Sequence, residues 1–182
     1  MKYTLYFIIF FLPFFAFADK NGTPYYFFGE KLLSEKEYQE LNSKDRKKVE
    51  FSFNTVWTAR AGRDKNNAVL TSLISKEIQV FVFSDTGSRL LQGATFFTEV
   101  AKHYQEVFKI KDKFKKGRTQ FGKKKCYSSS NRTKDGKFIQ IITRSSRNKC
   151  WRIIIVINEK DLRLKPVRTA FSLFMKSFRF LM

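Results

Sequence analysis

Two short stretches of this chain are apolar on both of their alternating faces, and they constrain the fold more than any other feature. Residues 78–83 and residues 153–157 consist almost entirely of β-branched and aromatic side chains. A strand of this composition is buried on both faces of its sheet, so each face needs an apolar cover. We therefore expect both stretches to be central strands, with helices on at least one side of the sheet and preferably on both.

The amino-terminal half contains signals for two further strands and a helix. The aromatic residues 25–28 predict the start of a strand or a packed loop. Ser34 and Glu37 have the spacing of a capping box, which marks a helix start. From residue 49 to residue 59 apolar and polar residues alternate, as in a half-buried strand, with Glu50 on the polar face.

The chain after residue 90 and the chain after Pro166 have the spacing of amphipathic helices. Each places apolar side chains three and four residues apart, which forms a stripe that can pack on a sheet. Proline suits the first turn of a helix. The stripes consist of Leu90, Ala94, Phe97, Ala101, Tyr104 and Phe108 in the first helix, and of Val167, Ala170, Phe171, Phe174 and Phe178 in the second. We expect both stripes to be core rather than cofactor sites.

Between these helices, residues 119–158 have the pattern of three successive strands. Turn signals at residues 134–136 and 145–148 separate them. The order of helix, antiparallel sheet with a meander, and closing helix with the tail Phe174-Met175-Lys176-Ser177-Phe178-Arg179-Phe180 resembles the PsbP-like fold of small exported proteins. That resemblance covers roughly the last two thirds of the chain. It implies an α+β fold, mainly an antiparallel sheet packed by helices with a C-terminal meander and closing helix, and a non-enzymatic accessory or binding role.

The first 18 residues have the composition of a signal peptide. Lys2 provides the basic start, residues 3–15 form an apolar run, and small residues occupy the two specificity positions before the expected cut. The run is shorter than the roughly 17 residues needed to span a bilayer, so we favour cleavage after Ala18 over an uncleaved anchor helix. The expected mature chain, residues 19–182, is a single α+β domain without a transmembrane span, periplasmic or secreted.

The expected mature chain is strongly basic. With Lys2 removed, 35 of the 36 basic residues remain against 16 acidic residues, a net charge of +19. Such a field attracts anionic partners, namely nucleic acid, lipopolysaccharide, an anionic membrane surface of acidic phospholipid, or a polyanionic glycan. The alternative is a lysine-rich chain that is merely soluble, and a protein partner stays open.

The densest positive charge lies in residues 109–125, where aromatic residues are interleaved with lysines. Lysines neutralise phosphates, while exposed rings stack on bases or enter a lipid interface. The alternative is a half-buried extended segment, in which Phe108, Ile110 and Phe114 face the core and the lysines face solvent. The candidate anion-binding residues here are Lys109, Lys111, Lys113, Lys115, Lys116, Arg118, Lys123, Lys124 and Lys125.

A second basic group lies near the predicted meander turns. It extends the same anion-binding surface, or it protects a sheet edge against association. The group consists of Arg132, Lys134, Lys137, Arg144, Arg147, Lys149 and Arg152, of which Arg132 and Arg147 are further candidate anion-binding residues.

Cys126 and Cys150 are the only two cysteines of the chain. An even count in an exported protein predicts one Cys126–Cys150 disulfide. A regular three-strand meander would hold these residues about 9.6 Å apart, beyond the roughly 7 Å limit for a disulfide. We therefore expect an irregular first strand that permits the disulfide, with direct pairing of the outer strands or two separate thiols as alternatives.

The sequence contains no recognisable catalytic motif or phosphate-binding glycine loop. His103, the only histidine, falls off the apolar stripe of its helix, which favours an exposed surface histidine over a catalytic base. We expect no cofactor and no metal. The leading hypothesis is an exported non-enzymatic accessory or binding protein that contacts an anionic partner through its basic surface. The alternative is a secreted hydrolase of unknown substrate.

Overall fold

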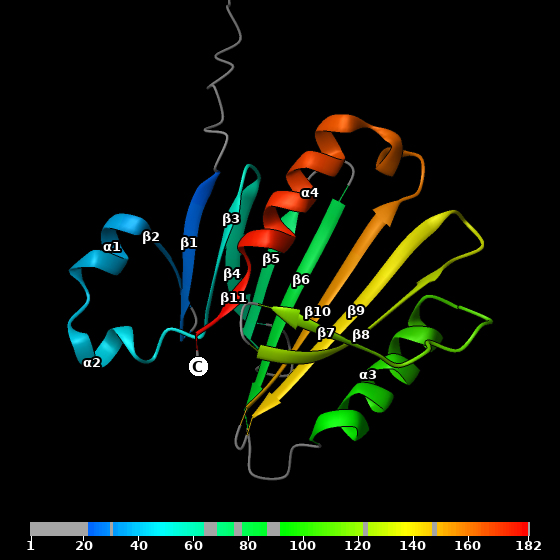
Figure 1. Ribbon diagram of the computed structural model, residues 1–182, viewed down its shortest axis with the longest axis horizontal. Helices are drawn as coiled ribbons and strands as arrows, with labels where there is room; N and C mark the ends of the chain where they lie inside the picture. The colour runs from blue at the N-terminus through cyan, green and yellow to red at the C-terminus, as the bar shows by residue number, and fades with distance from the viewer. Residues whose placement is uncertain are drawn as a thin grey trace, which may run out of the picture.

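The computed structural model describes residues 22–29, 31–63, 69–74, 78–86, 92–121, 124–146 and 149–181. Within these ranges the chain forms two antiparallel sheets and four α-helices, an α+β arrangement (Figure 1). Among the described helices, none combines the length and the apolarity that crossing a bilayer requires. The predicted signal peptide and its cleavage site lie outside the described residues.

The larger sheet has seven strands, and the two doubly apolar stretches of the sequence are at its centre. β6 and β10 pair with each other, with Val82 opposite Ile153. Each has a second neighbour, β5 beside β6 and β9 beside β10, so the prediction of central strands is confirmed. Across the sheet the order is β4 (Thr58–Arg63), β5 (Val69–Ile74), β6 (Ile78–Thr86), β10 (Lys149–Asn158), β9 (Lys137–Ser146), β8 (Lys124–Arg132) and β7 (Gly117–Phe121).

The stretch predicted as three strands contains four. β8, β9 and β10 form the expected meander. β7 runs back along the start of β8, with Phe121 opposite Lys124 and Gly117 opposite Ser128, so the predicted first strand is divided in two. A Cβ atom at Gly117 would stand 3.0 Å from the Ser128 carbonyl oxygen, so glycine permits this close approach.

The smaller sheet contains the strand predicted at residues 25–28, whereas the single strand predicted over residues 49–59 is divided between β3 (Phe51–Thr55) of this sheet and β4 of the larger one. The order of the smaller sheet is β11 (Arg179–Phe180), β3, β1 (Thr23–Phe28) and β2 (Lys31–Ser34). α1 (Glu35–Glu40) begins at the predicted capping box, in which the Ser34 N–H donates to Glu37 Oε2 at 2.7 Å. α2 (Ser43–Arg46) follows and leads into β3.

Different elements cover the two faces of the larger sheet. On one face Ile153 packs with Phe27 and Phe53 of the smaller sheet and with α4 (Lys165–Ser177), which follows the short 3-10 helix η1 (Asp161–Arg163). On the other face Ile141 and Ile154 pack against α3 (Gly93–Val107). The sequence predicted helices over a single sheet, whereas the phenylalanines of a second sheet supply much of the cover beside α4.

The predicted Cys126–Cys150 disulfide is not present in the structure, where the two residues are reduced thiols. Cys126 on β8 belongs to the core between the sheets, and Cys150 on β10 belongs to the core beneath α3. β9 lies between β8 and β10, so a whole strand and the thickness of the sheet separate the two sulfur atoms. A disulfide needs side chains that point toward each other from Cα atoms within about 7 Å. This geometry corrects the prediction.

Glu50 is buried, although the sequence pattern placed it on the polar face of a strand. It is 2% exposed and directly precedes β3. Its Oε2 accepts hydrogen bonds from Ser84 Oγ at 2.8 Å and from Trp151 Nε1 at 2.9 Å, and its Oε1 forms an ion pair with Lys149. Because Ser84 is on β6 and the other two partners are on β10, this carboxylate joins the smaller sheet to the larger one.

Candidate anion-binding cleft

The chain reverses tightly at the end of α3, where the lysine-rich residues 109–125 begin. Lys109 has a positive φ of 50°. Its N–H donates to the Glu106 carbonyl at 3.1 Å, and the Ile110 N–H donates to the Gln105 carbonyl at 2.9 Å. This pair of bonds is a Schellman motif, in which one left-handed residue allows the last helix carbonyls to be satisfied. The chain therefore turns back along α3 instead of leaving it.

Replacing Lys109 with glycine is expected to raise the free energy of unfolding by roughly 0.5–1 kcal/mol, because glycine adopts a positive φ without a Cβ clash. The melting temperature should rise by about 2 °C for a domain of this size. Lys111→Gly removes the same charge two residues later, where the structure has no positive φ. That variant should melt at or below the wild-type temperature. Thermal unfolding followed by circular dichroism measures both melting temperatures. If Lys109→Gly melts at a lower temperature than Lys111→Gly, the backbone at Lys109 is not strained.

The chain from residue 110 to residue 116 lies against α3 without regular secondary structure. Ile110 and Phe114 are 6% and 9% exposed and pack into the core beneath α3. The apolar side chains thus face inward, as the half-buried alternative predicts, but the segment is not a strand. We name the exposed cations of this region the basic segment: Lys109, Lys111, Lys113, Lys115, Lys116 and Arg118.

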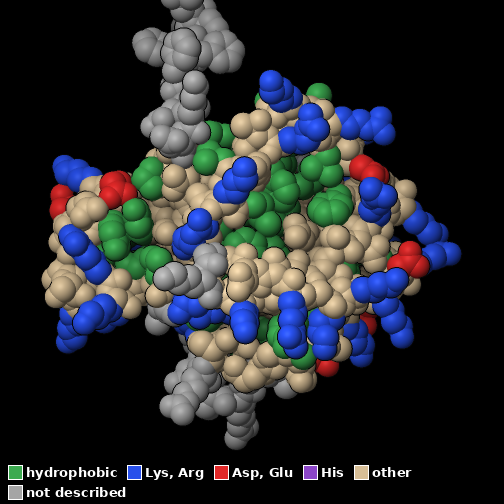
Figure 2. Space-filling view, viewed as in Figure 1, with side chains coloured by type: hydrophobic (Ala, Val, Ile, Leu, Met, Phe, Trp, Pro, Cys, Tyr) green, Lys and Arg blue, Asp and Glu red, His purple; other side chains and the backbone are tan. Residues whose placement is uncertain are grey.

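The positive surface continues onto the hairpin of β7 and β8. Lys125 is exposed and Lys124 is half-buried, while Lys123 lies outside the described residues. Lys116 Nζ stands 5.8 Å from the ring centroid of Tyr127, within the range of a cation–π contact. Figure 2 shows Lys and Arg side chains gathered below the centre of the view, over the region of this hairpin. The predicted cluster of residues 109–125 is therefore largely a solvent-facing surface.

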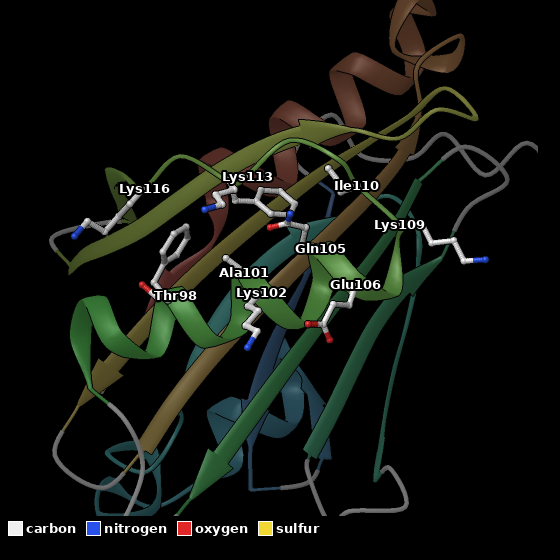
Figure 3. A pocket seen from close by; sticks show the side chains of 11 residues that line it. Thr98, Ala101, Lys102, Gln105, Glu106, Lys109, Ile110, Lys113 and Lys116 are labelled. Atoms are coloured by element: carbon white, nitrogen blue, oxygen red, sulfur yellow. The ribbon is translucent and has the colours of Figure 1, made fainter.

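A cleft of about 850 Å³ separates α3 from the segment that turns back along it. Figure 3 shows the side chains of α3 on one side and Lys113 and Lys116 on the opposite side. Thr98, Gln105 and the lysines form its walls, and buried apolar residues form its floor. The cleft is lined by Phe97, Thr98, Ala101, Lys102, Gln105, Glu106, Lys109, Ile110, Lys113, Phe114 and Lys116.

The charge pattern of the sequence predicts the lysine side of this cleft but not its α3 side. Thr98, Ala101, Lys102 and Gln105 recur three and four residues apart, so they share one helix face beside the core stripe. That spacing is the signal that could have identified them. The spacing does not reveal that the basic segment forms the opposite wall, because that arrangement depends on the reversal of the chain at Lys109.

The second basic group is distributed over both faces of the larger sheet instead of extending the basic segment. The Arg144 guanidinium lies 5.2 Å from the ring centroid of Trp151 on one face, and that of Arg152 lies 4.6 Å from the ring of Phe83 on the other. Ion pairs further join Lys149 with Glu50, Arg132 with Glu159 and Lys137 with Asp135. Several of these charges therefore have partners within the fold, and Arg147 lies outside the described residues.

Cys126 and His103 do not line the cleft. Cys126 lies in the core on the other face of the larger sheet, and burial raises the pKa of its thiol to about 11, so little reactive thiolate exists at neutral pH. His103 is exposed on α3 with its ring beside that of Tyr104, which confirms the predicted surface position. Within the described ranges, no group of three or more His, Cys, Asp or Glu side chains could hold a metal ion. The cleft itself offers ammonium groups above an apolar floor.

Comparisons with known proteins assign no family to the chain. No family model matches it, and no curated protein matches it. A crystal structure from Bacteroides thetaiotaomicron aligns with a TM-score of 0.38 and 9% identity, over 71% of this chain and 44% of that chain. This chain therefore spans less than half of that protein, and a likeness at this level carries no argument about fold or function. The resemblance to the PsbP-like fold stays a prediction.

Proposed function

We propose that the chain is an exported, non-enzymatic accessory protein that binds a membrane surface containing anionic lipids, in the periplasm or outside the cell. The observation that carries the proposal is the basic segment, in which all six cations between residues 109 and 118 are exposed. Asp112 is the only acidic residue between them. An anionic membrane surface attracts each nearby Lys or Arg by about 1 kcal/mol, so six together provide substantial affinity.

The orientation of the aromatic residues favours a lipid surface over nucleic acid. Binding of single-stranded nucleic acid relies on exposed rings that stack on bases. Phe114 and Phe121 are 9% and 4% exposed, so neither ring offers a stacking face, and Phe108 and Tyr127 are half-buried. A surface of lipid phosphates requires only charge and access, and the basic segment provides both.

Vesicle co-sedimentation tests the proposal on protein recovered after export, whose intact mass establishes where the chain begins. We expect binding to phosphatidylcholine vesicles that contain about a third phosphatidylglycerol, and at least roughly tenfold weaker binding to pure phosphatidylcholine. Raising the salt concentration from about 0.1 M to 1 M shortens the Debye length from about 10 Å to 3 Å. The protein should then leave the anionic vesicles.

Binding to single-stranded RNA, measured at the same phosphate concentration, is compared with binding to the anionic vesicles. Strong binding to RNA without binding to anionic vesicles would replace the lipid surface by nucleic acid as the partner. Binding to neither at low salt would show that the basic segment is only a solvated face. Equal binding to anionic and neutral vesicles would also contradict the proposal, because charge would then play no part.

A further inference from the structure

The cleft between α3 and the basic segment has an apolar floor beneath a charged mouth. The floor consists of Phe97, Ala101, Ile110 and Phe114, each of which is at most 9% exposed and presents a small apolar part of its side chain to the cleft rather than a whole ring face. The volume of about 850 Å³ lies within the range of roughly 300–1,000 Å³ that is typical of small-molecule pockets. The cleft is therefore large enough for a ligand that covers this floor.

The mouth of the cleft is positively charged. The charged residues of the lining are the four lysines Lys102, Lys109, Lys113 and Lys116 and the single acid Glu106, which gives a net charge of +3. The lining lysines belong to both walls, Lys102 to α3 and Lys113 and Lys116 to the opposite side, and Lys113 extends over the cleft (Figure 3). Each ammonium group offers three hydrogen-bond donors, and the methylene stems extend the apolar wall toward the mouth.

We propose that this cleft binds one single-chain anionic amphiphile, with its alkyl chain against the floor and its phosphate or carboxylate head among the lysines. The inference rests on the proposed binding of anionic lipid, and it names the class of lipid and the place that holds it. A small inorganic anion would leave the apolar floor unused, and an uncharged chain would leave the lysines at the mouth without a counter-charge. Charge and apolar surface together select a ligand that has both.

Isothermal titration with short alkyl phosphates, below the concentrations at which they form micelles, tests the ligand class. Decyl phosphate should bind with a stoichiometry of one. Each buried methylene strengthens binding by about fourfold, so decyl phosphate, with two more methylenes, should bind roughly fifteenfold tighter than octyl phosphate. Inorganic phosphate and the uncharged octyl glucoside should each bind far more weakly than octyl phosphate.

A matched pair of tryptophan variants tests the place. Thr98 and Thr95 are both exposed on α3, but only Thr98 lines the cleft. Thr98→Trp should fill the mouth and weaken decyl phosphate binding by at least about tenfold, whereas Thr95→Trp should bind it like wild type. Neither variant should bind anionic vesicles more weakly than wild type, because neither removes a charge of the basic segment.

Any of three results would overturn the inference. Inorganic phosphate could bind as tightly as decyl phosphate, or octyl glucoside as tightly as octyl phosphate. The third result is a Thr98→Trp protein that binds decyl phosphate as tightly as wild type does. Any of them alongside normal vesicle binding would contradict the cleft and leave the proposed function intact. If the wild-type protein binds decyl phosphate but does not bind anionic vesicles, the proposed function is wrong and the cleft is a site for free amphiphiles.

Discussion

Replacing Glu50 with alanine is expected to lower the free energy of unfolding by about 3–5 kcal/mol, because it removes one partner of a buried charged cluster. The Trp151 Nε1–H and the Ser84 hydroxyl lose their acceptor, and each buried donor left unpaired costs about 1–3 kcal/mol. The Lys149 side chain is 22% exposed, so its ammonium group recovers only part of the lost interaction from water. The melting temperature should fall by roughly 10 °C.

Thermal unfolding followed by circular dichroism measures this effect. Glu99→Ala is the control, because Glu99 is exposed on α3, and it should change the stability by less than about 0.5 kcal/mol. Glu50→Gln keeps an oxygen acceptor but loses the ion pair, so its melting temperature should lie between those of wild type and Glu50→Ala. If Glu50→Ala melts like Glu99→Ala, the carboxylate does not hold the two sheets together.

The local elements of this fold could be predicted because their signals lie within a few consecutive residues. β6 and β10 are apolar on both faces, and α1 begins at a capping box whose two members are three residues apart. α3 and α4 each bury an apolar stripe near the one that the spacing predicts, with Phe97, Ala101 and Phe174 among the buried residues. Such patterns follow from the period of a strand or a helix and need no knowledge of the tertiary structure.

The remaining features depend on which elements meet, and short-range patterns do not carry that information. Glu50 alternates with apolar residues as a solvent-facing residue does, but the larger sheet brings Ser84, Lys149 and Trp151 around it. Cys126 and Cys150 lie on opposite faces because the register of three strands places them there. The α3 side of the cleft likewise becomes visible only once the chain reverses after the helix.

Reversing four charges of the basic segment is expected to weaken binding to anionic vesicles by about a thousandfold or more, since each lysine near the surface contributes about 1 kcal/mol. The variant replaces Lys111, Lys113, Lys115 and Lys116 with glutamate. All four side chains are exposed, so the melting temperature should stay close to that of wild type. This stability measurement separates a loss of binding from a loss of folding.

The most direct test compares this variant with one that carries the same net charge elsewhere. Replacing the exposed residues Lys160, Lys165, Arg168 and Lys176 with glutamate also changes the charge of residues 19–182 from +19 to +11. Three of these residues belong to α4, which packs on the face of the larger sheet opposite to α3. Vesicle co-sedimentation of the two variants at about 0.1 M salt, where the Debye length is about 10 Å, is the deciding measurement. We predict that only the basic-segment variant loses binding, and equal losses in both variants would show that overall charge, not this surface, attracts the membrane.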